Sequence, residues 1–156
     1  DRFDLRGLVD AVVFSIVTRA QGAGLQCNTE IDPKLPETAT GDALRLRAAL
    51  ENLIDNAVKF TLRGSVDLKV IAKPLAKGTQ VTFEIADSGI GLSAAEIKRL
   101  FRPFVQAHEG IARRFGGTGL GLSLVKRLAN AMKGDLGVTS TPGRGSTFRL
   151  TVVLEP

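Results

Sequence analysis

Apolar positions recur at helical spacing in two segments of the first half of the chain. The first segment covers residues 5–20, where the apolar positions are Leu5, Leu8, Val9, Val12, Val13 and Ile16. The second covers residues 42–60, where they are Leu46, Leu50, Leu53 and Ala57. Spacings of three and four place such residues on one buried face of a helix. We therefore expect two amphipathic helices, the first ended by Gly22 and Gly24 and the second capped by Asp42.

Alternating apolar positions and turn residues predict a sheet. Strands are expected at residues 25–31, 66–70, 81–85, 136–140 and 147–154. Three segments lie between the strands at 81–85 and 136–140. They are a short helix at 93–101, a long loop at 102–119 and a third long helix at 120–132. Because strands and helices do not alternate strictly, we expect an α/β (α+β) two-layer sandwich. Its mixed, mostly antiparallel sheet would have about five strands, with three main helices on one face.

The polar side of the second helix carries two amides and an ammonium group. Asn52, Asn56 and Lys59 are four and seven residues apart, which brings them to within roughly 40° of one another around the helix. A solvated face is the simplest interpretation of each residue alone. Together, the three side chains are also suited to contacting a nucleotide.

Length and composition narrow the function classes. The chain has 156 residues and 44% apolar residues, enough for one domain, 1–156, with its own core. Its single cysteine, Cys27, excludes an internal disulfide. The net charge is +5, but the basic residues are scattered and aromatic residues do not alternate with them, so we do not expect nucleic acid as a partner.

Two glycine-containing segments follow the predicted strands. Asp87-Ser88-Gly89-Ile90-Gly91 places a hydrogen-bond acceptor and two glycines at a strand end, a pattern that ordinary turns also show. Residues 116–122, Gly-Gly-Thr-Gly-Leu-Gly-Leu, precede a helix and offer backbone N–H groups to phosphate, although a structural hinge is the alternative. The segment is neither a P-loop nor a dinucleotide fingerprint. Arg113, Arg114 and Lys126 could neutralise phosphate charge.

In this order, the motifs resemble those of the catalytic and ATP-binding domain of sensor histidine kinases. The family belongs to a superfamily that includes gyrase, a heat-shock chaperone and mismatch-repair ATPases. The resemblance covers nearly the whole chain. Its motifs are the N box at 52–61, the first glycine box at 87–91, the F box at 101–104, the second glycine box at 117–122 and the glycine turn at 143–148.

The resemblance implies a role for each matching residue. Asn56 would hold Mg²⁺, Asn52 and Lys59 would contact phosphates, and Asp87 would bind the adenine amino group, with Gly89 and Gly91 shaping the pocket floor. A mobile ATP lid would cradle the phosphates through Arg113, Gly117, Gly119 and Gly121. The resemblance also places in the nucleotide site Phe60, Leu92, Phe104, Thr118, Leu120, Leu122 and Thr147.

The residue type at position 52 distinguishes the subclasses of the superfamily. The ATP-hydrolysing members and the serine-kinase relatives have a glutamate base four residues before the Mg²⁺ asparagine. An amide cannot act as a general base near neutral pH, so we expect slow hydrolysis and transfer to a nucleophile that is already competent, such as histidine. Glu51 lies about 100° around the helix from Asn52, so we do not expect it to substitute.

These features predict a protein-histidine kinase domain that binds ATP and Mg²⁺ and acts in two-component signal transduction. Its partners would be a histidine-containing dimerisation and phosphoacceptor hairpin, expected upstream, and the receiver domain of a response regulator. We expect a monomeric, cytoplasmic domain of a homodimeric parent, which can itself be membrane-anchored. The only histidine, His108, has the wrong context for the acceptor. The alternatives are a degenerate nucleotide-binding scaffold and a superfamily ATPase.

Overall fold

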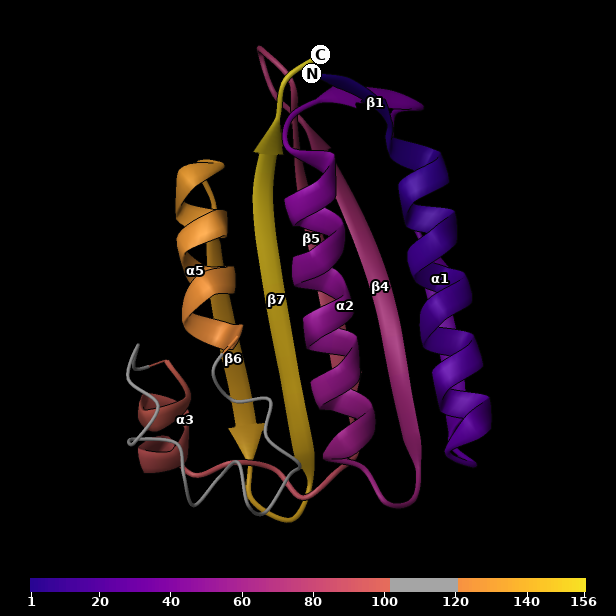
Figure 1. Cartoon of the computed structure of the whole chain (residues 1–156), viewed down its shortest axis with the longest axis vertical. Coiled ribbons are helices and arrows are strands. Elements are labelled where there is room, and N and C mark those ends of the chain that lie inside the picture. The colour runs from indigo at the N-terminus through magenta and orange to yellow at the C-terminus, as the bar shows by residue number, and fades with distance from the viewer. Residues whose placement is uncertain (102–120) are drawn as a thin grey trace.

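The computed structural model describes residues 1–101 and 121–156 (Figure 1). Its helices are α1 (Leu5–Gly22), α2 (Ala43–Lys59), α3 (Ala94–Leu100) and α5 (Gly121–Ala131). Its strands are β1 (Arg2–Asp4), β2 (Gln26–Ile31), β3 (Thr38–Thr40), β4 (Ser65–Pro74), β5 (Thr79–Asp87), β6 (Asp135–Thr141) and β7 (Gly145–Leu154). The predicted lid, residues 102–120, lies outside the described residues.

A five-stranded sheet forms one layer of the sandwich. Its strand order is β2-β4-β5-β7-β6, with β2 parallel to β4 and every other pair antiparallel. The predicted mixed, mostly antiparallel sheet is therefore confirmed. The register places Asp87, at the end of β5, opposite both Val66 of β4 and Ser146 of β7.

The long helices α1, α2 and α5 lie side by side over one face of this sheet (Figure 1). The predicted stripe of α2 is completely buried, as are alternate residues of the central strands. Together they form one apolar core between the two layers. The other face of the sheet carries polar and charged side chains, such as Lys69, Glu84 and Arg149, of which Glu84 and Arg149 form an ion pair.

Side-chain caps fix where the helices begin. Asp42 Oδ1 accepts a hydrogen bond of 3.0 Å from the backbone nitrogen of Arg45, which confirms the predicted cap of α2. Asp4 caps α1 in the same way. Ser93 and Glu96 form a reciprocal capping box at the start of α3.

A small second sheet was not predicted from the sequence. β1 pairs antiparallel with β3, and Thr40 at the end of β3 also exchanges backbone hydrogen bonds with Glu155. The two ends of the chain therefore lie together, at the opposite end of the sandwich from Asp87 (Figure 1). Strands of three residues are too short to show an alternating pattern.

Candidate functional site

Helix α2 brings together the three predicted polar residues. Asn56 is only 1% exposed, and its Nδ2 donates a hydrogen bond of 3.3 Å to Oδ1 of Asn52. Lys59 lies one turn further along, and its Nζ is 3.2 Å from Oδ2 of Asp55. The buried apolar stripe of α2 sets this orientation, because it leaves the amides at the border between core and surface.

Glu51 points away from these amides. Its carboxylate accepts hydrogen bonds from Ser15 Oγ at 2.5 Å and from Arg47 Nε at 2.9 Å, and Arg19 lies 3.5 Å away. Ser15 and Arg19 belong to α1, so Glu51 faces the α1–α2 contact. This orientation agrees with the expectation that Glu51 does not act as a base beside Asn56.

The carboxylate of Asp87 is buried, and its two oxygens differ in their hydrogen bonding. The residue is 8% exposed, and Oδ1 accepts hydrogen bonds from the backbone nitrogens of Gly89 and Ser146, at 2.9 and 3.3 Å. The second oxygen, Oδ2, is buried and has no hydrogen-bond partner among the described residues. Burial raises the pKa of Asp87 above its usual value, although the two backbone hydrogen bonds act in the opposite direction. A buried acceptor without a donor costs free energy, so this site favours a ligand that donates a hydrogen bond.

Glycines allow the backbone to pack closely around Asp87. A Cβ atom on Gly89 would lie 2.2 Å from the carbonyl oxygen of Phe60. Gly91 has a φ of +70°, and a Cβ atom there would lie 2.1 Å from the carbonyl oxygen of Thr141. Both glycines are therefore required by contacts within the protein, in addition to any contact with a ligand.

The β6–β7 hairpin contributes hydroxyl groups that the sequence prediction missed. Ser146, rather than Thr147, faces the same side of the sheet as Asp87, because Thr147 is opposite Ala86 and neighbouring side chains alternate. Ser146 Oγ lies 2.7 Å from Ser140 Oγ. Ser140 Oγ also accepts a hydrogen bond from the backbone nitrogen of Leu92, at 2.7 Å. The alternation from Phe148 to Leu154 could have shown that position 146 faces the helices.

Helix α5 begins at Gly121, and Leu122 is completely buried. That Lys126 could neutralise phosphate charge stays a prediction, and in this structure its side chain contacts other groups of the protein. Its Nζ lies 3.4 Å from Oδ1 of Asp135 and 5.3 Å from the centre of the Phe101 ring, so it points toward β6 and α3. The remaining predicted site residues lie outside the described part of the chain: Phe104, Arg113, Gly117, Thr118, Gly119 and Leu120.

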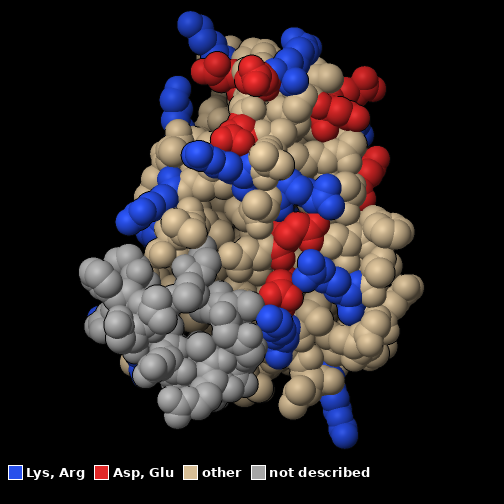
Figure 2. Space-filling model, in the orientation of Figure 1, with Lys and Arg blue, Asp and Glu red and all other residues tan. Residues whose placement is uncertain are grey.

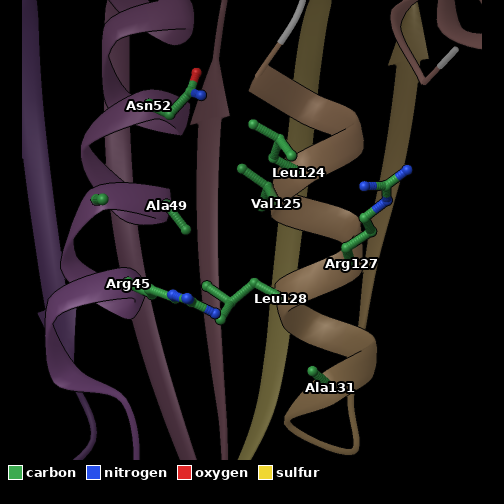
Figure 3. A pocket seen from close by; sticks show the side chains of 9 residues that line it. Arg45, Ala49, Asn52, Leu124, Val125, Arg127, Leu128 and Ala131 are labelled. Atoms are coloured by element: carbon green, nitrogen blue, oxygen red, sulfur yellow. The ribbon is translucent and has the colours of Figure 1, made fainter. Parts of the chain in front are cut away.

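A groove of about 520 Å³ separates α2 from α5 (Figure 3). Asn52 of α2 lies at one end of it, near Leu124 and Val125 of α5. The lining is mainly apolar, with Arg45 from α2 and Arg127 from α5 also contributing. The groove therefore opens directly beside the amides of α2.

Among residues 1–101 and 121–156, no three His, Cys, Asp or Glu side chains are grouped closely enough to hold a metal ion. Mg²⁺ requires less of the protein, because one or two oxygen ligands suffice and phosphates and water complete its shell. A single amide such as Asn56 meets that requirement.

Comparison with known proteins identifies the family. Residues 41–156 match the family of histidine kinase-, DNA gyrase B- and HSP90-like ATPases. The chain belongs to this family. It is 40% identical over 154 residues to the signal transduction histidine-protein kinase BarA of Escherichia coli, and 41% identical over 155 residues to the two-component system protein A of Emericella nidulans. These alignments cover 98% and 97% of the chain but only 17% and 23% of the relatives.

Solved structures of histidine kinases share this ATPase-family fold. Full-length ShkA, crystallised in complex with AMPPNP, matches all of the chain over 31% of its own length, with 34% identity and a TM-score of 0.78. The catalytic domain of the histidine kinase ThkA matches with a TM-score of 0.71 over 98% of its length, and at 21% identity it supports the fold alone. No helix in the described residues of this ATPase-family chain is long and apolar enough to cross a membrane.

Proposed function

We propose that the chain binds Mg-ATP and transfers the γ-phosphoryl group to a histidine on a separate dimerisation and phosphoacceptor domain, in two-component signal transduction. The observation that carries the proposal is the amide of Asn52, hydrogen-bonded to Asn56 where a hydrolytic member of the superfamily would have a carboxylate base. A neutral amide cannot activate water by taking its proton. A histidine imidazole already has a nucleophilic nitrogen and does not need such a base.

Asn56 is the residue that would hold Mg²⁺. Its Nδ2 donates to Asn52, which turns its Oδ1 away from the neighbouring amide. When bound, the cation neutralises charge on the phosphates during transfer. We assign phosphate contacts to Asn52, Lys59 and Arg113. To reach a phosphate, Lys59 must break its ion pair with Asp55, which costs little free energy because the pair is exposed to solvent.

Asp87 would accept a hydrogen bond from the adenine amino group. Its unpartnered Oδ2 is suited to a donor, and the amino group is the donor on that edge of adenine. Further contacts with the nucleotide are assigned to Phe60, Gly89, Gly91, Leu92 and Leu122. The segment before α5 would surround the phosphates through Gly117, Thr118, Gly119, Leu120 and Gly121, with Phe104 near its start.

The proposed reaction requires other domains. The chain spans about a sixth of the length of BarA, so the acceptor histidine is assigned to a different domain of the parent protein. We propose residues 1–156 as a single catalytic domain, monomeric by itself, within a homodimeric parent. The phosphoryl group would pass onward to an aspartate in a receiver domain. Because the reaction consumes ATP, we place it in the cytoplasm.

Replacing Asn56 tests this function. Asn56→Ala should reduce transfer from labelled ATP to a separately supplied acceptor hairpin by roughly 100-fold, since it removes the proposed cation ligand. Nucleotide binding should also lose its dependence on Mg²⁺. Asn130→Ala, on the exposed side of α5, is the control for replacing an asparagine, and circular dichroism checks that both variants fold.

Three outcomes would overturn parts of the proposal. Unchanged transfer and Mg²⁺ dependence in Asn56→Ala would show that the cation site is wrongly assigned. ATP binding without transfer to any hairpin would indicate a nucleotide-binding scaffold. Rapid phosphate release by the unmodified chain would indicate a hydrolytic ATPase.

A further inference from the structure

The two hydroxyl groups beside Asp87 are arranged in an unexpected way. Ser146 is directly opposite Asp87 in the strand pair, and its backbone nitrogen already donates to Oδ1 of that carboxylate. A hydroxyl next to a buried carboxylate usually donates to it as well, because a hydrogen bond to a charged acceptor is about twice as strong as a neutral one. Here Oδ2 of Asp87 has no partner within residues 1–101 and 121–156.

Ser140 accounts for this arrangement. Its Oγ lies 2.7 Å from Ser146 Oγ, on the neighbouring strand. The Ser140 hydroxyl is itself fixed, because it accepts a hydrogen bond from the backbone nitrogen of Leu92 at 2.7 Å and donates one to the carbonyl oxygen of Gly145 at 3.1 Å.

Either serine hydroxyl could donate the bond between them, and one of the two arrangements leaves no proton for Asp87. A hydroxyl has one proton and two lone pairs. If the Ser140 proton goes to Gly145, both lone pairs of Ser140 are filled by accepting from Leu92 and from Ser146. The single proton of Ser146 is then used by Ser140, and none remains for Asp87.

The neighbourhood of Asp87 also has room for a ligand. A hollow of about 250 Å³ is lined by Asp87, Ser140, Gly145 and Ser146 among others. Asp87 therefore borders space that a ligand can enter. A ligand amine that donates to Oδ2 recovers the free energy that the empty acceptor costs.

We propose that Ser140 is a positioning residue for nucleobase recognition: by binding the Ser146 hydroxyl, it keeps Oδ2 of Asp87 open for the exocyclic amine of an adenine nucleotide. This inference rests on the proposed function, because it takes ATP as the ligand. Ser140 acts through Ser146 and has no assigned contact with the nucleotide. Without Ser140, the Ser146 hydroxyl rotates to Asp87 and competes with the amine.

The test compares ATP with purine riboside triphosphate, which lacks the amino group, by equilibrium binding to the 156-residue chain. The unmodified chain should bind ATP about tenfold more tightly than the analogue, the value of one hydrogen bond to a charged acceptor. Ser140→Ala should weaken ATP binding about fivefold and change analogue binding less than twofold, so the preference for ATP is nearly lost.

A double variant separates this mechanism from a general loss of structure. Ser140→Ala combined with Ser146→Ala has no competing hydroxyl, so the preference for ATP should return. Ser140→Thr keeps the hydroxyl and should keep the preference; it also serves if Ser140→Ala does not fold. Thr82→Val is the matched control, because Thr82 forms a similar hydroxyl pair with Thr151, at 3.2 Å, on the open face of the sheet.

Equal losses for both ligands in Ser140→Ala, or no return of the preference in the double variant, would overturn the inference and leave the proposed function standing. Loss of the preference in a folded Ser140→Thr would also overturn it. If the unmodified chain binds neither ATP nor the analogue, the proposed function itself fails.

Discussion

The two ends of the candidate site are built differently. At the carboxylate end, defined by Asp87, Gly89, Gly91 and Ser146, backbone segments of several elements approach so closely that a single Cβ atom would collide with them. At the amide end, defined by Asn52, Asn56 and Lys59, all side chains come from one helix. In the proposed function, recognition of the base would thus depend on close backbone packing, whereas the phosphate contacts would depend on the side chains of one helix.

The charged groups at the two ends also differ in their exposure to solvent. Burial raises the pKa of the Asp87 carboxylate, whose Oδ2 has no partner in the described part of the chain. Near the amide end, Lys59, Asp55 and Arg19 form ion pairs at the surface, where charges of both signs lie interspersed on the helix-covered face (Figure 2). Solvent weakens such pairs, so they contribute little to folding. Substitutions at the two ends should therefore have very different effects on stability.

The largest effect on stability is expected for Gly91→Ala. The positive φ disfavours alanine by about 1 kcal/mol, and the collision with Thr141 adds to this, for a total loss of about 2–4 kcal/mol in the free energy of unfolding. Urea unfolding measures the loss. Gly137→Ala is the control, because a Cβ atom there meets nothing within 4 Å, and it should stay within about 0.5 kcal/mol. Similar losses in both variants would contradict the proposed rigidity of the carboxylate end.

Asp87→Asn should separate binding from stability. It should weaken ATP binding by roughly 10- to 100-fold, because an amide is a poorer acceptor than a carboxylate and can turn a donor toward the amine. The same change should increase the stability of the free chain at neutral pH, since it removes a buried charge. Titration calorimetry and urea unfolding measure the two effects.

The raised pKa of Asp87 also predicts how the difference in stability between Asp87→Asn and the unmodified chain changes with pH. The pKa of Asp87 is raised in the folded chain, so its charged form opposes folding. The stability advantage of Asp87→Asn should be small below the pKa of an unfolded aspartate, grow as the pH rises through the folded pKa, and then stay constant. An advantage that grows toward acid pH would contradict the assigned desolvation.

The smallest effect on stability is expected for Asp55→Asn. This variant breaks exposed ion pairs with Arg19 and Lys59, so the free energy of unfolding should change by less than about 0.5 kcal/mol at moderate salt. Urea unfolding at low and high salt measures it, with Glu30→Gln, which breaks a similar exposed pair with Lys69, as the control. A loss above about 2 kcal/mol would show that the amide end is as rigid as the carboxylate end.

The sequence predicted the amide end better than the carboxylate end. The stripe of Leu46, Leu50, Leu53 and Ala57 and the cap at Asp42 are local features with helical spacing, and the structure confirms them. The sheet was also predicted, because long strands alternate clearly. These features depend on residues close together in the chain.

Features that depend on register were harder to predict. Finding Ser146 in addition to Thr147 requires knowing which residue lies opposite Asp87, since Asp87 and Ser146 are 59 positions apart in the chain. The direction of Lys126 depends on Asp135, which lies on a different element. The glycines of the first glycine box were expected to let the backbone approach a ligand, which stays a prediction. The structure adds that a Cβ atom at either position would collide with backbone atoms of the protein itself.

The central claim is that Asn52 directs the phosphoryl group to histidine instead of water. The most direct test measures phosphate release and phosphorylation of a supplied acceptor hairpin in the unmodified chain and in Asn52→Glu. We predict that the unmodified chain phosphorylates the hairpin and releases phosphate slowly. Asn52→Glu should release phosphate at least about tenfold faster, because a carboxylate can act as a general base. Rapid phosphate release by the unmodified chain, or no gain in the folded variant, would contradict the account.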